Sequence, residues 1–174
     1  MPGFSVQGGN TANSKLNKAE YRRKHRWRVS TLQGGPVGPA DFLQLKSASR
    51  PSFTLNEAEV HHDQEVAYFA GKQTWEPITL TFYDAVGGGA NDIASLMYQW
   101  INTVSDIPSA NVGLPINYKK SLLLQSTDNE GNADETWTLH GCWPSKSNWN
   151  DLDYSNTEIQ LVEITIRFDR ATRE

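Results

Sequence analysis

The sequence predicts a mainly β fold, a small β-sandwich or barrel with one flanking α-helix. Several segments alternate between apolar and polar residues with a period of two, which is the pattern of half-buried strands. One segment alone repeats with helical spacing, and runs rich in glycine and proline separate the pieces. A chain of 174 residues is within the usual range of a single domain.

The first predicted strands lie between residue 24 and residue 83. Apolar and polar side chains alternate in the segment RWRVST, residues 26–31, and shorter strand-like pieces follow at about 42–48, 52–60 and 65–70. The polar segment from Glu57 to Glu65 interrupts them, and we expect a connection too long for a tight turn, free to reach a neighbouring molecule. Residues 78–83, ITLTFY, predict a clean half-buried strand.

A helix is predicted over residues 91–104, after the glycine run at 87–89. Asn91 or Asp92 is the expected N-cap. Its apolar residues form one stripe: Ile93, Leu96, Met97, Trp100, Ile101 and Val104. We expect this stripe to cover a sheet face, so that the helix is an outer buttress. Ser95, Tyr98, Gln99 and Asn102 then remain for solvent or a partner.

Three further strands are predicted in the last third of the chain, at about 117–126, 134–142 and 157–169. A polar hairpin loop centred on Gly131 joins the first two. In the third, the apolar positions change parity after Leu161, which predicts a bulge or burial on both faces.

Charge is distributed unevenly along the chain. Residues 1–50 hold nine Lys or Arg and two acids, and residues 51–174 hold seven and eighteen, so the two parts carry +7 and −11. We interpret residues 1–23 as a flexible basic arm and residues 24–174 as the folded domain. The split indicates either a solvated basic tail or two charged surfaces that meet between copies. In the second case the expected partners are Arg22, Arg23, Lys24 and Arg26 on one copy and Glu57, Glu59, Asp63 and Glu65 on another.

The search for catalytic chemistry finds little. Adjacent His61 and His62 on a strand point to opposite faces and chelate one metal poorly, and Cys142 is the single cysteine. The glycine run at 87–89 has neither P-loop nor dinucleotide spacing. No apolar run approaches the length of a membrane span. We therefore expect no catalytic, metal-binding or cofactor-binding residue, no cofactor, no enzyme activity and no membrane anchor.

Six tryptophans leave binding functions open. Trp75 and Trp149 sit beside turns and are expected at an interface between subunits, although tryptophans on a β-sandwich can also bind carbohydrate. The basic cluster beside Trp27 can contact nucleic acid phosphates. An acidic partner surface, including another copy of the chain, is an equally good target.

Three short motifs follow one another in the last third of the chain: Tyr-Lys-Lys-Ser at 118–121, Gly-Cys-Trp-Pro at 141–144 and Asn-Thr-Glu-Ile-Gln at 156–160. In this order they resemble the tail tube protein family of contractile-tailed bacteriophages, which is related to tube proteins of type VI secretion and other contractile injection machines. The close match covers about a third of the residues.

This resemblance implies a structural protein that assembles six to a ring, in rings stacked into a hollow tube. The implied partners are further copies of the chain, a tail sheath protein, baseplate and tail terminator proteins, and, in the lumen, a tape measure protein and DNA. Tyr98, Gln99 and Asn102 of the predicted helix are the expected sheath-facing residues. The implied location is the virion tail, assembled in the host cytoplasm.

Other functions remain open at this point. Within the same class the alternatives are a tube subunit of another contractile injection machine and a baseplate tube initiator. Outside it, the alternative is a carbohydrate-binding β-sandwich.

Overall fold

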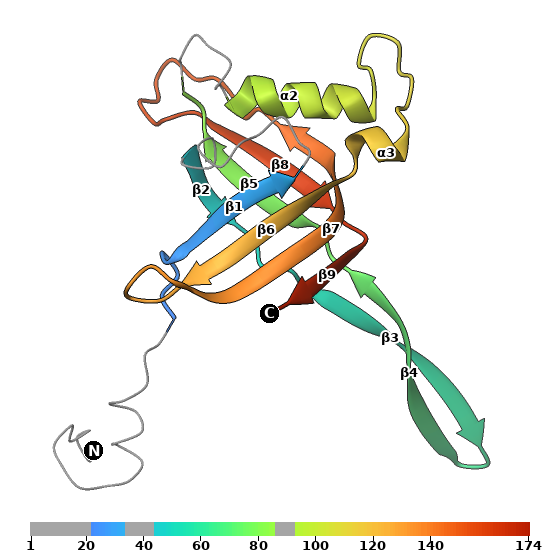
Figure 1. Cartoon of the computed structure of the whole chain (residues 1–174). Helices are drawn as coiled ribbons and strands as arrows, with labels where there is room; N and C mark the ends of the chain where they lie inside the picture. Colours follow the sequence, from blue (N-terminus) through green and yellow to red (C-terminus); the bar gives the residue numbers. More distant parts are fainter. Residues whose placement is uncertain (1–21, 34–43, 86–92) are drawn as a thin grey trace, which may run out of the picture.

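A computed structural model describes residues 22–33, 44–85 and 93–174 of the chain (Figure 1). The predicted basic arm lies outside the described residues up to residue 21. The predicted N-cap, Asn91 or Asp92, and the glycine run at 87–89 also lie outside them.

The described part of the chain is mainly β, as predicted. The strands are β1 Trp27–Gln33, β2 Leu45–Ala48, β3 Phe53–His62, β4 Glu65–Trp75, β5 Ile78–Tyr83, β6 Lys120–Thr127, β7 Ala133–Asn148, β8 Leu161–Arg167 and β9 Arg170–Arg173. The helices are α2 Ile93–Val104 and the single turn α3 Pro115–Tyr118, which was not predicted. Each pair of neighbouring strands is antiparallel.

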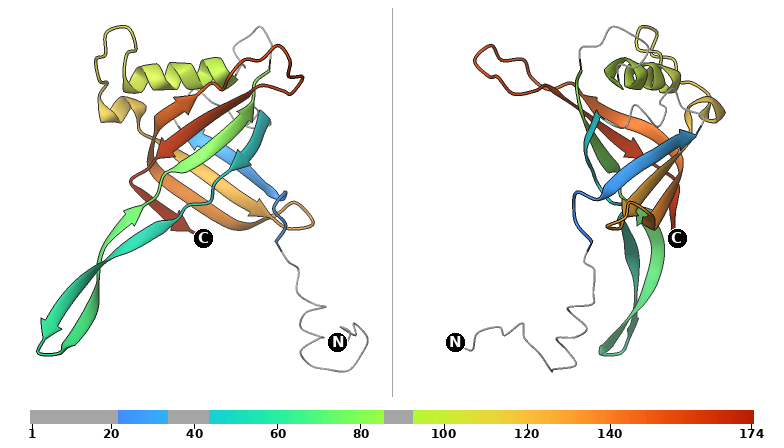
Figure 2. Two further views of the ribbon diagram at one scale, coloured as in Figure 1. Left: turned by 180° about the vertical axis from the view of Figure 1, so that it is seen from behind. Right: turned by 60° about the vertical axis from the view of Figure 1, so that its left-hand side comes forward.

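The long strand β7 joins the two sides of the barrel. Its first half pairs with β6 and β9, and its second half pairs with β8. The change occurs next to Gly141, whose φ of 69° is in the left-handed region that favours glycine. The resulting strand order is β1-β6-β7-β8-β5-β2, so β1 and β2 are the edges of a sheet that curls into an open barrel (Figure 2).

The last predicted strand is in fact two strands, and its parity change has a simpler cause than a bulge or burial on both faces. Ile159 is 66% exposed and lies before β8 begins at Leu161. Within β8 the burial alternates regularly. An interruption at Asp169, beside Gly141, separates β8 from β9, and both pair with β7.

The hydrophobic core fills the barrel and extends to α2. Its buried residues are Val29, Ile78, Leu80, Phe82, Ile93, Leu96, Met97, Trp100, Leu122, Leu124, Leu139, Cys142, Val162, Ile164, Ile166 and Phe168. The first two turns of the predicted helical stripe are therefore buried, and Ile101 and Val104 are half-buried. α2 lies across the end of the barrel opposite the C-terminus (Figure 1). The Trp100 indole N–H donates to the Tyr118 carbonyl at 2.8 Å, which connects α2 to α3.

Strands β3 and β4 form a separate hairpin that projects away from the barrel (Figure 2). The prediction of a long polar connection from Glu57 to Glu65 was wrong, because the chain turns in two residues, with Asp63 at a φ of 51°. The segment is polar because no core of its own molecule lies behind it: every residue of the hairpin before Trp75 is exposed. The polar composition of residues 57–65 therefore indicated a loop where the chain forms two paired strands.

Shortening a buried side chain of α2 should destabilise the fold. Leu96 is 8% exposed and packs in the core, so Leu96→Ala leaves a cavity and should cost about 2–5 kcal/mol of unfolding free energy. Urea denaturation measures this cost. Gln99→Ala, on the exposed face of the same helix, is the control and should change stability little. An unchanged midpoint in Leu96→Ala would contradict the packing of α2.

Two glycines with positive φ should respond differently to alanine. Gly131, at a φ of 87°, has open space around it, so Gly131→Ala should cost only the strain of the left-handed conformation, about 1–2 kcal/mol. At Gly141 a new Cβ also overlaps the carboxylate of Asp169, which accepts from Lys119 at 2.7 Å. Gly141→Ala should therefore lower the thermal midpoint more than Gly131→Ala, and equal shifts would argue against this close approach.

Candidate functional site

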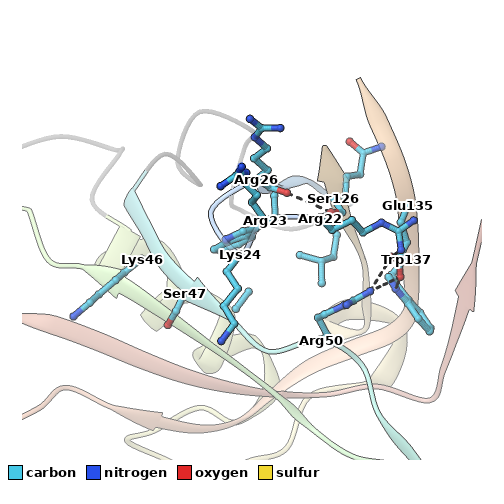
Figure 3. A pocket seen from close by; sticks show the side chains of 14 residues that line it. Arg22, Arg23, Lys24, Arg26, Lys46, Ser47, Arg50, Ser126, Glu135 and Trp137 are labelled. Carbon is cyan, nitrogen blue, oxygen red and sulfur yellow. Dashed lines mark hydrogen bonds and ion pairs between the residues drawn. The ribbon is translucent and has the colours of Figure 1, made fainter. Parts of the chain in front are cut away.

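A basic pocket lies where the chain enters β1 and faces β2 (Figure 3). Three separate segments supply its cations: Arg22, Arg23, Lys24 and Arg26 before β1, Lys46 in β2, and Arg50 after β2. Trp27, Leu124 and Trp137 form its apolar wall. We call this set the basic pocket.

A buried carboxylate forms one side of the basic pocket. The Glu135 side chain is 2% exposed and lies in the first half of β7. It accepts hydrogen bonds from Arg50 at 2.6 and 2.8 Å and from the Trp137 indole at 2.6 Å. Arg22 lies 2.8 Å and Arg173 3.1 Å from its oxygens. One carboxylate thus joins three arginines that are distant in the sequence.

The environment of Glu135 keeps it charged. Burial alone raises the pKa of a carboxyl group, because it removes the hydration of the anion. Here the hydrogen bonds from Trp137 and Arg50, together with the nearby arginine charges, outweigh burial and hold the pKa of Glu135 below its ordinary value. The pocket wall is therefore anionic at neutral pH and fixes the arginines that contact it.

The structure brings the four predicted cations together. Arg22, Arg23, Lys24 and Arg26 all line the basic pocket, and Arg22 also forms an ion pair with Asp134 of its own chain. Sequence reasoning missed Lys46 and Arg50 as members of the site. It also missed Glu135, although a signal was available, since strand alternation places this acid on the same face as the apolar Trp137 and Leu139.

The four predicted acids all lie in the hairpin, but not on one face. Glu57 and Glu59 are two residues apart and share a face with Tyr68, which pairs with Glu59. Glu65 pairs with His62 on the opposite face, and Asp63 is in the turn. We call Glu57, Glu59 and Tyr68 the acidic face.

Below the Glu65–His62 pair, the opposite face of the hairpin is apolar. Ala58 pairs with Phe69 and Val60 pairs with Ala67, so these four side chains lie together. Phe69 is 57% and Val60 52% exposed. We call Ala58, Val60, Ala67 and Phe69 the apolar face.

Two predicted interface tryptophans occupy different places. Trp75 is half-buried at the root of the hairpin, 5.2 Å from Phe53 and 5.6 Å from Phe168 between ring centroids. Trp149, which is 37% exposed, lies 6.4 Å from Tyr98 of α2. The structure therefore places Trp149 beside a residue predicted to face a sheath.

The other predicted sheath-facing residues differ in exposure. Gln99 is exposed and lines a shallow groove with Tyr98 and Trp149. Asn102 is half-buried, and its Oδ1 is buried without a hydrogen-bond partner in the described structure. Of the three, Tyr98 and Gln99 are the better exposed for contact with a partner.

The described residues offer neither a cluster of metal-binding side chains nor a reactive thiol. Within residues 22–33, 44–85 and 93–174, no three His, Cys, Asp or Glu side chains group as metal ligands. Burial raises the pKa of the Cys142 thiol to about 12, so this thiol stays protonated and is a poor nucleophile. Among the same residues, no helix has the length and apolar character of a membrane span.

The fold matches parts of contractile injection machines. A chain of the sheath-tube complex of an extracellular contractile injection system, PVC, in its extended state has a TM-score of 0.65 and 20% identity, over 96% of this chain and 99% of the other. A chain of the PVC sheath/tube terminator scores 0.70 at 19% identity, over 90% and 99%. A chain of the anti-feeding prophage tube-terminating cap scores 0.68 at 21% identity, over 90% and 92%. These likenesses define the tail tube fold.

Sequence comparison identifies the family. A tail tube protein of Serratia phage KSP90 is 30% identical over 140 residues, which are 77% of this chain and 77% of the relative. Residues 44–172 match the family described as T4-like virus tail tube protein gp19. The chain belongs to this family of phage tail tube proteins. It is a subunit of the virion tail and a structural protein, not an enzyme, and the resemblance seen in its sequence is confirmed.

Replacing Glu135 should lower the free energy of unfolding and make it vary less with pH. Glu135→Gln removes the charge that attracts three arginines and should cost about 1–3 kcal/mol at pH 7. Because the folded pKa lies below the ordinary value of 4.5, the stabilisation is present above that pH and is lost as pH falls through the folded pKa.

Urea denaturation at several pH values measures this effect. The gap between wild type and Glu135→Gln should be constant near neutrality and narrow below about pH 4.5. Glu158→Gln changes an exposed acid and serves as the control, with little effect expected. A gap that does not vary with pH would show that lost packing, rather than lost charge, destabilises the variant.

Proposed function

We propose that copies of this chain assemble, six to a ring, into stacked rings that form a hollow tube for the passage of DNA. One observation carries the proposal: the β3–β4 hairpin exposes an apolar face and has no core of its own molecule behind it. An isolated two-stranded hairpin is marginally stable in water, so a surface of another copy is needed to cover it. Membership of the tail tube family supports the same assembly.

The barrel also has edges to pair. Among the described residues, β1 and β2 end the strand order, and the outer side of each has no strand partner. Unpaired edges promote association, and a closed ring removes them by pairing strands of neighbouring copies. The proposed assembly unit is the domain of residues 24–174, with residues 1–23 as its basic arm.

The proposed tube has an exterior and a lumen with different requirements. We place the outer face of α2, with Tyr98 and Gln99, toward a tail sheath, and the tube ends against baseplate and terminator proteins. Acidic or neutral side chains in the lumen repel DNA phosphates and let DNA slide after the tape measure protein has left. The net charge of −11 over residues 51–174 is compatible with such a lumen. Assembly takes place in the host cytoplasm.

Charging the apolar face should block assembly but not folding. In the Val60→Asp and Phe69→Asp double variant, two exposed apolar side chains become anionic, and a covered interface has to desolvate these charges. We expect stacked rings of wild type in negative-stain electron microscopy and monomers of the variant in analytical ultracentrifugation. The thermal midpoint of the monomer should stay the same, because both residues lie outside the core.

The matched control is Val112→Asp, which changes an exposed valine outside the hairpin. It should leave the rings intact. Wild type that remains monomeric at high concentration, with and without a nucleating baseplate complex, would overturn the proposed assembly. Rings of other than sixfold symmetry would correct the ring size.

A further inference from the structure

The structure holds two surfaces of opposite charge that do not meet within one molecule. We infer that the acidic face of the hairpin in one copy docks in the basic pocket of another copy. This contact rests on the proposed function, because it is one of the contacts that hold copies together in the tube. It specifies which surfaces meet.

Within the described residues, the basic pocket is lined by more cations than acids. Glu135 pairs with Arg22 and Arg50, and Asp134 pairs with Arg22. Lys46 lies over the Tyr83 ring, 5.7 Å from its centroid. Of the other cations, Arg23 and Lys24 are exposed and make no ion pair within the described residues. These two cations at the mouth of the pocket attract an anionic partner.

The acidic face of the hairpin offers what such cations bind. Glu57 and Glu59 present two carboxylates on one side of β3, with His61 Nε2 3.6 Å from the Glu59 carboxylate on the same face. Tyr68, 63% exposed, lies across from Glu59 on β4. A shallow groove runs along these residues. Carboxylates pair with a guanidinium through charge-assisted hydrogen bonds, and an aromatic ring binds its flat face. The acidic face thus complements Arg23 and Lys24 in charge, and Tyr68 offers a ring for the Arg23 guanidinium.

The hairpin cannot reach the basic pocket of its own molecule. Arg50 is fixed to Glu135 in the pocket, and β3 begins three residues later and leads away from the barrel (Figure 2). Glu57 and Glu59 lie four and six residues beyond the start of β3, so at about 3.3 Å per residue they are carried roughly 13–20 Å out along the hairpin, away from the barrel that holds the basic pocket. Another copy must supply the partner. In the proposed tube this contact runs head to tail, so it repeats from copy to copy.

Charge reversal and its rescue test the pairing. The Glu57→Lys and Glu59→Lys double variant should raise the protein concentration needed for tube formation by about tenfold or more, and screening by salt should reduce this difference. Adding Arg23→Glu and Lys24→Glu to the same chain should restore assembly toward the wild-type level. The control Glu76→Lys changes an exposed acid just outside the hairpin and should have little effect.

Cross-linking between copies identifies the contact directly. Protein with Glu59→Cys is mixed with protein carrying Lys24→Cys, assembled and mildly oxidised. The native Cys142 is buried and stays reduced, so a disulfide-linked dimer reports only the new pair. We expect this dimer in the assembled fraction, and no dimer when Glu76→Cys replaces Glu59→Cys.

The outcomes separate this inference from the proposed function. Tubes that form normally without the dimer, and without rescue by Arg23→Glu and Lys24→Glu, would overturn the docking while the tube function stands. An equal loss of assembly in Glu76→Lys would show an effect of net charge and would also overturn it. If wild type forms no ring or tube, the proposed function fails and the docking fails with it.

Discussion

The buried carboxylate of Glu135 is the constraint on which both the basic pocket and the start of the β3–β4 hairpin depend. A charge that is 2% exposed needs nearby partners, and the chain supplies Arg22, Arg50 and Arg173 from three separate segments. Arg50 precedes β3, so its bonds to Glu135 set where the hairpin leaves the barrel. Arg22 draws the basic segment onto the same wall. One side chain therefore positions both the basic pocket and the root of the acidic hairpin.

The barrel and the hairpin satisfy opposite physical requirements. In the barrel, β7 passes from one layer to the other beside Gly141, and the apolar side chains of both layers and of α2 share one core. This part of the chain has its own core, although among the described residues the outer edges of β1 and β2 have no strand partner. The hairpin has a regular ladder and a tight turn, yet beyond its root at Phe53 and Trp75 no core of its own molecule lies behind its side chains. The core stabilises the first part, and the apolar face that another copy has to cover belongs to the second.

The elements that the sequence predicted correctly are those defined by local periodicity. Residues 78–83 and the helical stripe from Ile93 to Trp100 face one core, so their patterns are clear. Strand-like pieces were expected at 52–60 and 65–70, but the tight turn that joins them was not, because strands without a core behind them have no reason to be apolar on average. The pairs of Glu135 with Arg22 and Arg50 join residues 113 and 85 positions apart, and no local pattern encodes such a contact. The four clustered cations were predictable because they are adjacent in sequence.

The charge asymmetry of the chain acquires a spatial meaning in the fold. Cations from residues 22–50 gather at the basic pocket, whereas acids of the 51–174 part lie along a projecting hairpin. In the proposed tube the two surfaces meet head to tail, so the same contact repeats from copy to copy. Each exposed ion pair is weak, at about 0.2–1 kcal/mol, and salt screens it. Repetition around a ring multiplies these small terms, while the apolar face supplies attraction that salt does not screen. A tube built this way is stable as an assembly although each charged contact alone is reversible.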